Sequence, residues 1–546
     1  MRKLTLAGLL VLISAAVMAD DLEQQVRTTM EKRLEVQHRM LSLGDCIRIA
    51  LEHNLDVQIS RMDPEIAGFS LKSAYAGYDP TFSLSGRHNY ELSPGGLDEQ
   101  SRAYTGTESE IDSFNGSLGG LLPWGTRYTF GATVSDRSGN SPGAVIDPGN
   151  SFITTNAIYD INTGLPSGYL YSTNYGTLPT RNPFENAAAN VGFFELRQPL
   201  LKDFWVDGTR LQIFLNRKNL QRSEVQLRSQ IIQTITAVEE AYYNFIYSEE
   251  TVKVQEKALE LAQRLVAENR RRVEVGALAP LDERQAESEA ASRQADLLEA
   301  RSNRGTQQRA LKNLLSDDYA AWLTTEIHPT DTLRAVPQPL SLQDSWRRGM
   351  ADRPDLQQAR IDVQMQEKRV VYADNQRYPQ LDLVGDIGYA GSARNTGQAF
   401  KQVRNLDNTY YAYGAQLTIP LGNIGARNNY KAARTTRDQL ELVLKQLEQN
   451  AMIEIENAIA VARSSLERVD ATRQARAYAE EALRAEEMKL EKGKSTSFVV
   501  LDLQSKLTAA RSAEIRALAD YNIALARLAR FEGSTLERHG VELKLR

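Results

Sequence analysis

Two short motifs in this 546-residue sequence resemble sites that carry chemistry, and each lacks a part that the chemistry requires. The Gly-x-Ser-x-Gly pattern of a serine nucleophile occurs at residues 139–143, within a stretch rich in Gly, Pro and Asn. A nucleophile elbow needs a strand before the serine and a helix after it. Gly493-Lys494-Ser495 ends like a phosphate-binding loop, but Met488 stands where the first glycine of that loop belongs. We interpret both matches as chance.

The remaining residues that could do chemistry are scattered. No two histidines have the His-x-x-x-His spacing that binds zinc from one helix; the five are His38, His53, His88, His328 and His539. Carboxylates are abundant, but on charged helices most lie on solvated faces or in pairs along the helix. The single cysteine, Cys46, excludes an intrachain disulfide, and we predict that it lies on the buried face of a helix starting at Leu43. We expect no catalytic site, metal site or cofactor.

The strongest pattern is a pair of helical runs of roughly seventy residues, each ending at a glycine. Counted back from Gly276 and Gly493, residues 235–276 align without a gap with residues 452–493. Apolar residues recur in steps of four and three, as in helices that pack lengthwise. They are Ile231, Ile235, Val238, Tyr242 and Phe245 in the first run, and Ile455, Ile459, Ala462, Leu466 and Val469 in the second. At about 1.5 Å per residue, each run is on the order of 100 Å long.

The two runs belong to two copies of one unit, because residues 41–45 align with 340–344 and the match continues beyond them. Each copy is predicted to contain a helix, a strand, a loop, a strand, a long helix, a glycine turn and a helix. Ser42 and Ser341 are the expected N-caps of the first helices. The predicted boundaries are a signal peptide at 1–19, an N-terminal segment at 20–40, the first repeat at 41–317, a linker with short local structure at 318–339, the second repeat at 340–532 and a loosely held tail at 533–546.

Apolar and polar side chains alternate in two predicted strands of each half, at about 80–90 and 189–198 and at about 380–390 and 410–420. Proline ends the second strand of each pair because it cannot donate to the ladder. Alternation alone suits a sheet with one wet face. Strands of about ten residues with aromatic ends, in an exported chain, indicate a membrane-spanning sheet. Four strands cannot close a barrel without edges facing lipid, so several chains must contribute.

The first half differs by a long insertion, residues 91–188. Residues 114–122 and 126–134 again alternate and are joined by Pro123-Trp124-Gly125, a turn sequence. We interpret the stretch 113–136 as a hairpin outside the sheet, and an additional pair of barrel strands is the alternative. Residues 138–150 and 162–183 are rich in Gly, Ser, Asn and Pro, so we expect exposed loops.

The N-terminus has the order of a secretory signal. Arg2 and Lys3 precede the apolar stretch 4–17, and Ala19 closes a small-residue cleavage site. An uncleaved anchor is the alternative, but the stretch is short for a membrane span. With 65 Lys and Arg against 70 Asp and Glu, the charge is nearly balanced and nucleic acid is not an expected partner.

Together, these elements resemble the TolC family of outer-membrane efflux and secretion channels over essentially the whole mature chain. The motifs that carry the resemblance are the paired Leu-Ser-Leu-x-Asp starts, Arg353-Pro354-Asp355-Leu356, Arg197-Gln198-Pro199-Leu200, Ile419-Pro420-Leu421 and the glycine turns. The resemblance implies a mainly α fold with β: a long-helix periplasmic α-barrel plus a transmembrane β-barrel shared by a homotrimer. It implies location in the outer membrane, in contact with its lipid, and extension into the periplasm. The implied partners are a periplasmic adaptor protein and an inner-membrane pump, and the implied function is a passive exit duct for efflux or type I secretion.

The resemblance also indicates where the gate and the adaptor-docking tips lie. Their residues are Val275, Gly276, Ala277, Leu278 and Asp282 at the first turn, and Gly493, Lys494 and Ser495 at the second. Family members can carry acidic rings six and nine positions after the second glycine. Those positions are Val499 and Asp502, so Asp502 alone is expected to constrict the pore and to favour cations. Leu490 and Ser495 replace a tyrosine and an arginine of the family's latch, and Lys492 or Lys494 paired with Asp282 is a hypothetical substitute.

Two other classes of exported protein share part of this pattern. A structural coiled coil or adhesive envelope protein would have the heptads, but it does not account for amphipathic strands in both halves. A periplasmic adaptor would have a helical hairpin with a small sheet domain and no lipid-facing strands. A channel accounts for both features, and the sequence does not indicate its cargo.

Overall fold

The computed structural model describes residues 37–97, 103–276 and 279–542. The predicted signal peptide lies outside these ranges. The chain divides into two compact units, which are described separately. The helical unit comprises the described parts of Met1–Ser70, Arg217–Met365 and Arg437–Arg546, and the strand unit comprises Leu71–Asn216 and Gln366–Thr436. Within the described ranges, no helix combines the length and apolar character that a membrane crossing requires.

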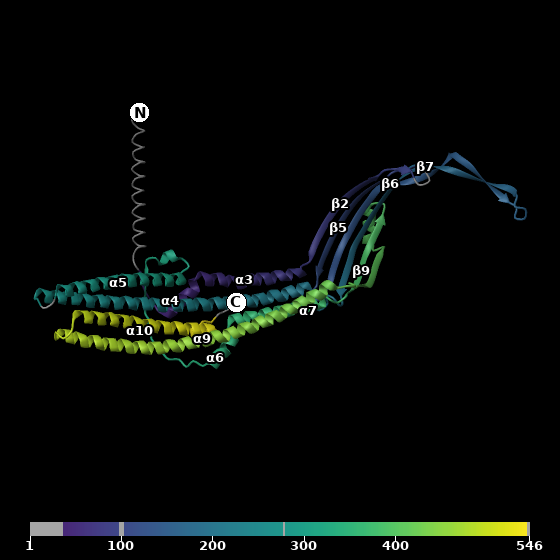
Figure 1. Ribbon diagram of the computed structural model, residues 1–546. Helices are drawn as coiled ribbons and strands as arrows, with labels where there is room; N and C mark the ends of the chain where they lie inside the picture. Colours follow the sequence, from purple (N-terminus) through teal and green to yellow (C-terminus); the bar gives the residue numbers. More distant parts are fainter. Residues whose placement is uncertain (1–36, 98–102, 277–278, 543–546) are drawn as a thin grey trace, which may run out of the picture. The chain divides into compact units, whose positions relative to one another are not determined.

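The long helices follow the predicted pattern, and two of them contain 67 and 68 residues. The two longest continue from one unit into the other, and each is followed by a glycine turn and a helix of 36 residues. The helices are α2 Leu43–His53, α3 Leu55–Ala74, α4 Gly208–Glu274, α5 Pro280–Leu315, α6 Leu342–Asp352, α7 Pro354–Asn375, α9 Ile424–Glu491, α10 Ser497–Glu532 and α11 Thr535–Arg538 (Figure 1).

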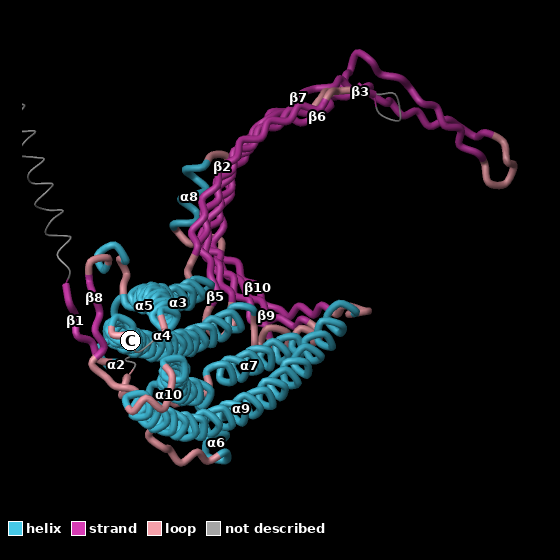
Figure 2. Tube along the Cα trace, turned by 60° about the vertical axis from the view of Figure 1, so that its left-hand side comes forward, coloured by secondary structure: helices cyan, strands magenta, loops and turns pink. Residues whose placement is uncertain are grey.

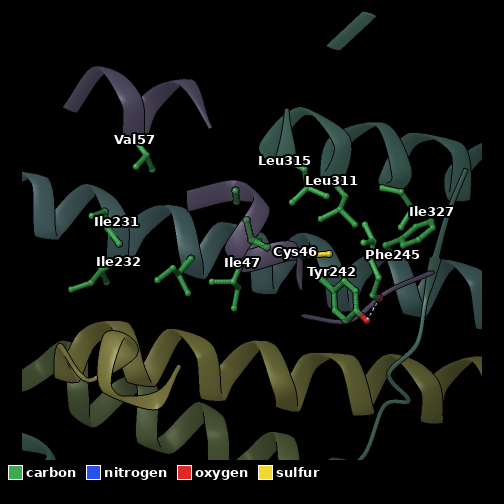
Figure 3. Close-up of a cluster of buried hydrophobic side chains, with 14 of the residues drawn as sticks. Cys46, Ile47, Val57, Ile231, Ile232, Tyr242, Phe245, Leu311, Leu315 and Ile327 are labelled. Atoms are coloured by element: carbon green, nitrogen blue, oxygen red, sulfur yellow. Dashed lines mark hydrogen bonds between the residues drawn. The ribbon is translucent and has the colours of Figure 1, made fainter. Parts of the chain in front are cut away.

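The apolar seam predicted from the four-and-three spacing forms the core of the helical unit. Ile231, Ile235, Val238, Tyr242 and Phe245 are all buried in α4 and pack against α2, α5 and a short strand (Figure 3). In α9, Ile455, Ile459, Ala462 and Val469 are likewise buried, and Leu466 is partly buried. Since burial of one apolar stripe stabilises a helix more than intrinsic propensity does, these stripes explain why both runs remain helical over such a length.

The repeated start of each half is a capped helix, as predicted. The Ser42 hydroxyl accepts a hydrogen bond from the Asp45 amide at 3.2 Å and donates to the Asp45 carboxylate at 2.7 Å. Ser341 accepts from the Asp344 amide at 3.4 Å. The Asp45 carboxylate has a pKa below its ordinary value because of the hydrogen bonds from Ser42. Both halves therefore begin with the N-cap that their sequence predicts.

Cys46 lies on the buried face of α2, as predicted, and its side chain is fully inaccessible (Figure 3). Burial raises the pKa of this thiol to about 12, and the neighbouring Asp45 and Asp331 add to the effect. Since the thiolate is the reactive form, we expect Cys46 to react with a disulfide reagent only after unfolding. Thiol titration at pH 8, with and without guanidinium, measures this; rapid reaction in the native protein would contradict the packing of α2.

The linker and the N-terminal segment contain a sheet that the sequence did not indicate. Strand β1 (Gln37–Leu41) pairs in parallel with β8 (Thr325–Pro329), after a 3-10 turn, Tyr319–Trp322. Beyond β8, the Asp331 carboxylate accepts hydrogen bonds from the Leu43 amide and the Tyr242 hydroxyl, both at 2.8 Å. The linker is therefore attached to the start of α2 and to the core of α4.

The strand unit is built around a six-stranded sheet in the order β10-β9-β7-β6-β5-β2, and every pairing in it is antiparallel (Figures 1 and 2). The final strands of the two halves end beside the prolines, as predicted, at Pro199 and at Thr418, two residues before Pro420. The sheet consists of β2 Thr81–Ser93, β5 Thr107–Leu121, β6 Arg127–Tyr159, β7 Pro166–Pro199, β9 Gln380–Ala393 and β10 Thr409–Thr418. A short pair, β3 Gly96–Leu97 with β4 Ala103–Tyr104, lies in the insertion.

The interpretation of residues 113–136 as a hairpin outside the sheet is wrong. Strands β5 and β6 lie in the middle of the sheet, between β2 and β7, and are joined through the predicted turn at 123–125. The expected loops at 138–150 and 162–183 are wrong for most of their length, since β6 and β7 pair through 138–147 and 166–183, whereas the turn before Pro166 and the irregularity after Asp147 are unpaired. Their Gly, Asn and Pro content lowers strand propensity, but continuous pairing with a long partner strand outweighs it.

Two shorter segments also differ from expectation. The segment between β9 and β10 contains a helix, α8 (Thr396–Arg404), which lies beside the sheet (Figure 2). It packs Ala399 and Val403 against small residues of β7. The tail is packed over its described part rather than loosely held. Helix α11 buries Leu536, and the His539 imidazole lies 3.0 Å from the carboxylate of Glu239, which is buried in α4.

Candidate functional site

The first predicted tip is a tight reversal between α4 and α5. Gly276 has a φ of 75°, which a residue with a side chain adopts only at a cost, and its amide donates to the Val273 carbonyl at 2.9 Å. Helix α5 then begins at Pro280, and the Asp282 carboxylate accepts from the Ala279 amide at 3.3 Å. Val275 is exposed, whereas Ala277 and Leu278 lie outside the described ranges. Asp282 is thus used as a helix cap.

The second tip repeats the same reversal between α9 and α10. Gly493 has a φ of 69°, and the Lys494 amide donates to the Lys489 carbonyl at 2.8 Å. The Ser495 hydroxyl donates to the Glu486 carboxylate at 2.5 Å, which fixes the turn against the last part of α9. The hydrogen bonds from Lys489 and Ser495 lower the pKa of Glu486 below its ordinary value, so its carboxylate is ionised at neutral pH.

A buried pair of polar side chains connects the two helical hairpins close to their tips. The Asn269 amide group, on α4, donates to the Asp282 carbonyl at 3.2 Å. Its oxygen accepts from the hydroxyl of Ser497, at the start of α10, at 3.1 Å. Both side chains are almost completely buried. Only the bond between Ser497 and the Asn269 oxygen joins the two hairpins, so separating them leaves this hydroxyl and this oxygen to be solvated.

An apolar cluster surrounds this connection. It joins α4, α9 and α10 through six buried residues: Leu265, Leu483, Leu490, Val500, Leu501 and Leu507. Leu490, which stands where the family's latch can have a tyrosine, is therefore a packing residue in this chain. Within one chain, the two hairpins are held together near their tips by this cluster and by the Asn269–Ser497 hydrogen bond.

The hypothetical latch between a lysine and Asp282 does not form within this chain. Among the ion pairs of the described residues, none joins Lys492 or Lys494 to Asp282. The Asp282 carboxylate is instead occupied by the cap of α5. Both lysines are exposed.

Asp502 has a partner that the sequence interpretation overlooked. Its carboxylate lies 2.6 Å from the ammonium nitrogen of Lys506, one turn further along α10. Both side chains are about half exposed or more, and such pairs are weak. Spacing of four residues on a helix could have revealed the pair. A ring of Asp502 carboxylates would thus carry an adjacent ring of lysines.

Apolar side chains are exposed beside both glycine turns. They are Val275 and Leu281 near the first turn, and Met488, Phe498 and Val499 near the second. Val499, the sixth residue after Gly493, gives the second turn an apolar residue at a position where relatives can have a carboxylate. These exposed apolar side chains are candidates for an interface with another protein.

The sheet of the strand unit has two chemically distinct faces. One face is apolar across all six strands and exposed within this chain: Phe82 and Leu84, Phe114 and Leu118, Phe130, Phe194 and Leu196, Leu383 and Ile387, Tyr411 and Tyr413. The other carries polar residues such as Ser83, Thr129, Glu195 and Gln416. On this polar face Arg197, from a motif of the resemblance, pairs with the nearly buried Asp382 at 2.5 Å.

Two groups of side chains in the described ranges have the composition of a metal site, although none was expected. They are His38, Glu326 and His328, on β1 and β8, and His88, Glu110 and Asp112, on β2 and β5. Sequence spacing could not show the first group, because His38 and His328 are 290 positions apart. The second group depends on the pairing of β2 with β5, which brings His88 opposite Asp112.

Comparison with known proteins gives a consistent result. A family model described as outer membrane efflux protein matches residues 186–316 and 348–534, one segment in each repeat. No curated protein matches the sequence. Solved structures with the same fold include the CmeC outer membrane channel of Campylobacter jejuni, with 16% identity, a TM-score of 0.60 and coverage of 90% of this chain and 86% of that one. The outer membrane protein VceC of Vibrio cholerae has 17% identity, a TM-score of 0.59 and coverage of 90% and 96%.

Proposed function

We propose that this chain, which belongs to the outer membrane efflux protein family, is the passive outer component of a three-part export assembly and is gated at its two glycine turns. The family and the fold are those of an outer-membrane exit duct for efflux, located in the outer membrane and extending into the periplasm. They also confirm the predicted fold class, mainly α with β, in which long helices are joined to the strands of an outer-membrane channel. A barrel shared by three chains is part of the proposal. The family and the fold are both those of channel proteins rather than of enzymes.

The observation that carries the proposal is the open sheet with its apolar face. In the described part of the chain, β2 and β10 are edge strands, each with one neighbour only. An apolar face that wide suits lipid, and lipid does not tolerate unpaired strand edges. Pairing of β10 of one copy with β2 of the next would satisfy both edges. The polar face then lines a conduit.

The turns are proposed to be the surface that a periplasmic adaptor and its inner-membrane pump engage. The support is the exposed apolar side chains at both reversals, Val275 and Leu281 at one and Phe498 at the other. Adaptor contact would favour an open arrangement in which the hairpins separate, with Gly276 and Gly493 at their ends. Small molecules, metal ions and proteins remain alternative cargoes. An exported structural coiled coil would have the same helices but would not conduct.

Single-channel conductance in a planar bilayer tests both the channel and its proposed constriction. Asp502→Asn removes a carboxylate from each of three chains, so we expect cation selectivity to fall. Lys506→Gln frees the same carboxylate from its ion pair at 2.6 Å, so we expect selectivity to rise. Because the pair is exposed, each change should be severalfold at low salt and smaller at high salt.

The matched control is Lys253→Gln, an exposed helix lysine paired with Glu250 at 2.7 Å and distant in sequence from both turns. It should leave selectivity unchanged. If conductance steps are present but change with neither Asp502→Asn nor Lys506→Gln, the protein is a channel and Asp502 is not its constriction. If folded protein gives no conductance steps, either alone or with its adaptor, the alternative of an exported structural coiled coil is favoured.

A further inference from the structure

We propose that His38, Glu326 and His328 form a binding site for a divalent transition-metal ion of the zinc class, which fastens strand β1 to strand β8. The three side chains project from one face of the two-stranded parallel sheet. His38 is the register partner of Glu326, and His328 lies two residues further along β8. Since side chains two apart in a strand share a face, the backbone itself holds the three together.

The donor atoms converge on one point. Nδ1 of His38 lies 3.0 Å from Nε2 of His328 and 3.6 Å from a carboxylate oxygen of Glu326. Donor atoms around a tetrahedral Zn²⁺ with bonds of about 2.0–2.1 Å are separated by about 3.3 Å. Small side-chain movements therefore bring all three into coordination, and water completes the shell. Two imidazoles and one carboxylate are a ligand set that zinc accepts in proteins.

Neighbouring residues contact those polar atoms of the ligands that are not offered to the metal. Arg304 occupies Oε1 of Glu326 at 2.8 Å and leaves Oε2, the oxygen facing His38, available. The second nitrogen of His328, Nδ1, lies 3.7 Å from the Glu249 carboxylate. A carboxylate behind a ligating histidine orients the ring and strengthens its donor atom. Glu249 and Glu326 lie beside Arg304, and the buried Lys312 also interacts with Glu326, so the charges around the site are close to balanced.

The second group, His88 with Glu110 and Asp112, is a poorer site. Its two carboxylates approach opposite nitrogens of one imidazole, Asp112 at Nδ1 (2.9 Å) and Glu110 at Nε2 (3.9 Å). The donor atoms lie within 4.8 Å of one another, but the shortest carboxylate contacts are to different nitrogens, so a shared ion requires one carboxylate to move. This group is satisfied as an exposed hydrogen-bonded cluster, which makes His88 a useful control.

The location of the site indicates what the metal would do. A two-stranded sheet is marginally stable by itself, and this one attaches the start of the described chain to the linker between the two repeats. One ion bound by both strands would cross-link segments separated by 290 residues, as a structural zinc does in other folds. The site is independent of the proposed gate, because none of its residues lies near the glycine turns in sequence.

Zinc binding to full-length protein, purified through a tag without histidine, tests the proposal. We expect about one Zn²⁺ per chain by equilibrium dialysis, no comparable uptake of Mg²⁺, and visible absorption from tetrahedral Co²⁺. His38→Ala and His328→Ala should each raise the Kd for Zn²⁺ about tenfold or more. His38 is 62% exposed, so its variant is expected to fold normally.

His53→Ala and His88→Ala are the matched controls, since each removes an exposed histidine that is hydrogen-bonded to an aspartate. Both should bind Zn²⁺ as the wild type does. Zn²⁺ should also raise the Tm of the wild type and of both controls, but not that of His38→Ala. Binding lost in His88→Ala and kept in His38→Ala, or no binding by the wild type, would overturn the proposal. Equal loss in every histidine variant would identify adventitious surface binding and overturn it as well.

Discussion

Replacing Arg353 with methionine is expected to lower the free energy of unfolding by about 2 kcal/mol, less than for a fully buried ion pair because both partner carboxylates are 44% exposed. The Arg353 side chain is only 11% exposed, and its guanidinium lies 2.7 Å from Asp355 and from Glu454 of α9. It also donates to the Phe531 carbonyl of α10 at 3.5 Å. Methionine retains the packing of the stem but leaves both carboxylates without their cation. Chemical unfolding followed by circular dichroism measures the change.

The matched control is Arg347→Met, because Arg347 is 79% exposed and pairs with Asp344 three residues away. Its expected effect is below about 0.5 kcal/mol. Similar losses in the two variants would show that the α6–α7 junction does not depend on Arg353.

The same variant has a defined pH dependence. Burial by itself would raise the pKa of Asp355, but the hydrogen bonds and charge of Arg353 hold it below the ordinary 3.8. A carboxyl whose pKa is lower in the folded state contributes stability above its unfolded pKa and loses it as pH falls through the folded pKa. The difference between wild type and Arg353→Met should therefore be greatest near pH 7 and shrink below about pH 4.

Features with a local physical cause were predictable from sequence. The stripe from Ile231 to Phe245, the serine caps and the prolines that end the strands each follow from a few neighbouring residues, and each lies where expected. The same holds for the glycine reversals, since a positive φ at Gly276 and Gly493 suits a residue without a side chain. Because the sequence contains two copies of one unit, each of these features could be predicted in both halves.

Features that depend on pairing across long sequence distances were not predictable. Gly139 reads as a loop residue, yet its register partners are Ser109 on one side and Phe184 on the other. The packed tail depends on His539 meeting Glu239, 300 positions away. Helical periodicity defines which face of α4 is buried, but not which residue of α10 that face meets. Asn269 and Ser497 could therefore not be identified as a pair before the structure was known.

Locking these two residues together is expected to abolish transport. Asn269→Cys with Ser497→Cys, in a Cys46→Ala background without other thiols, places a cysteine on each hairpin where the native side chains touch at 3.1 Å. Oxidation, or a short thiol-reactive cross-linker, would prevent the hairpins from separating. If opening requires that separation, export in cells and conductance in bilayers should both fall to background and recover after reduction.

Each single cysteine variant, treated identically, controls for the loss of the native hydrogen bond, and mass spectrometry confirms the cross-link. Ser497→Ala is the opposite perturbation: without the bond the closed arrangement loses about 1 kcal/mol, which is roughly fivefold in the open-to-closed ratio. Channel openings should therefore become more frequent while the cross-linked protein stays closed. Full transport through a completely cross-linked protein would mean that the hairpins of one chain move as a rigid pair, and that any gate lies between chains instead.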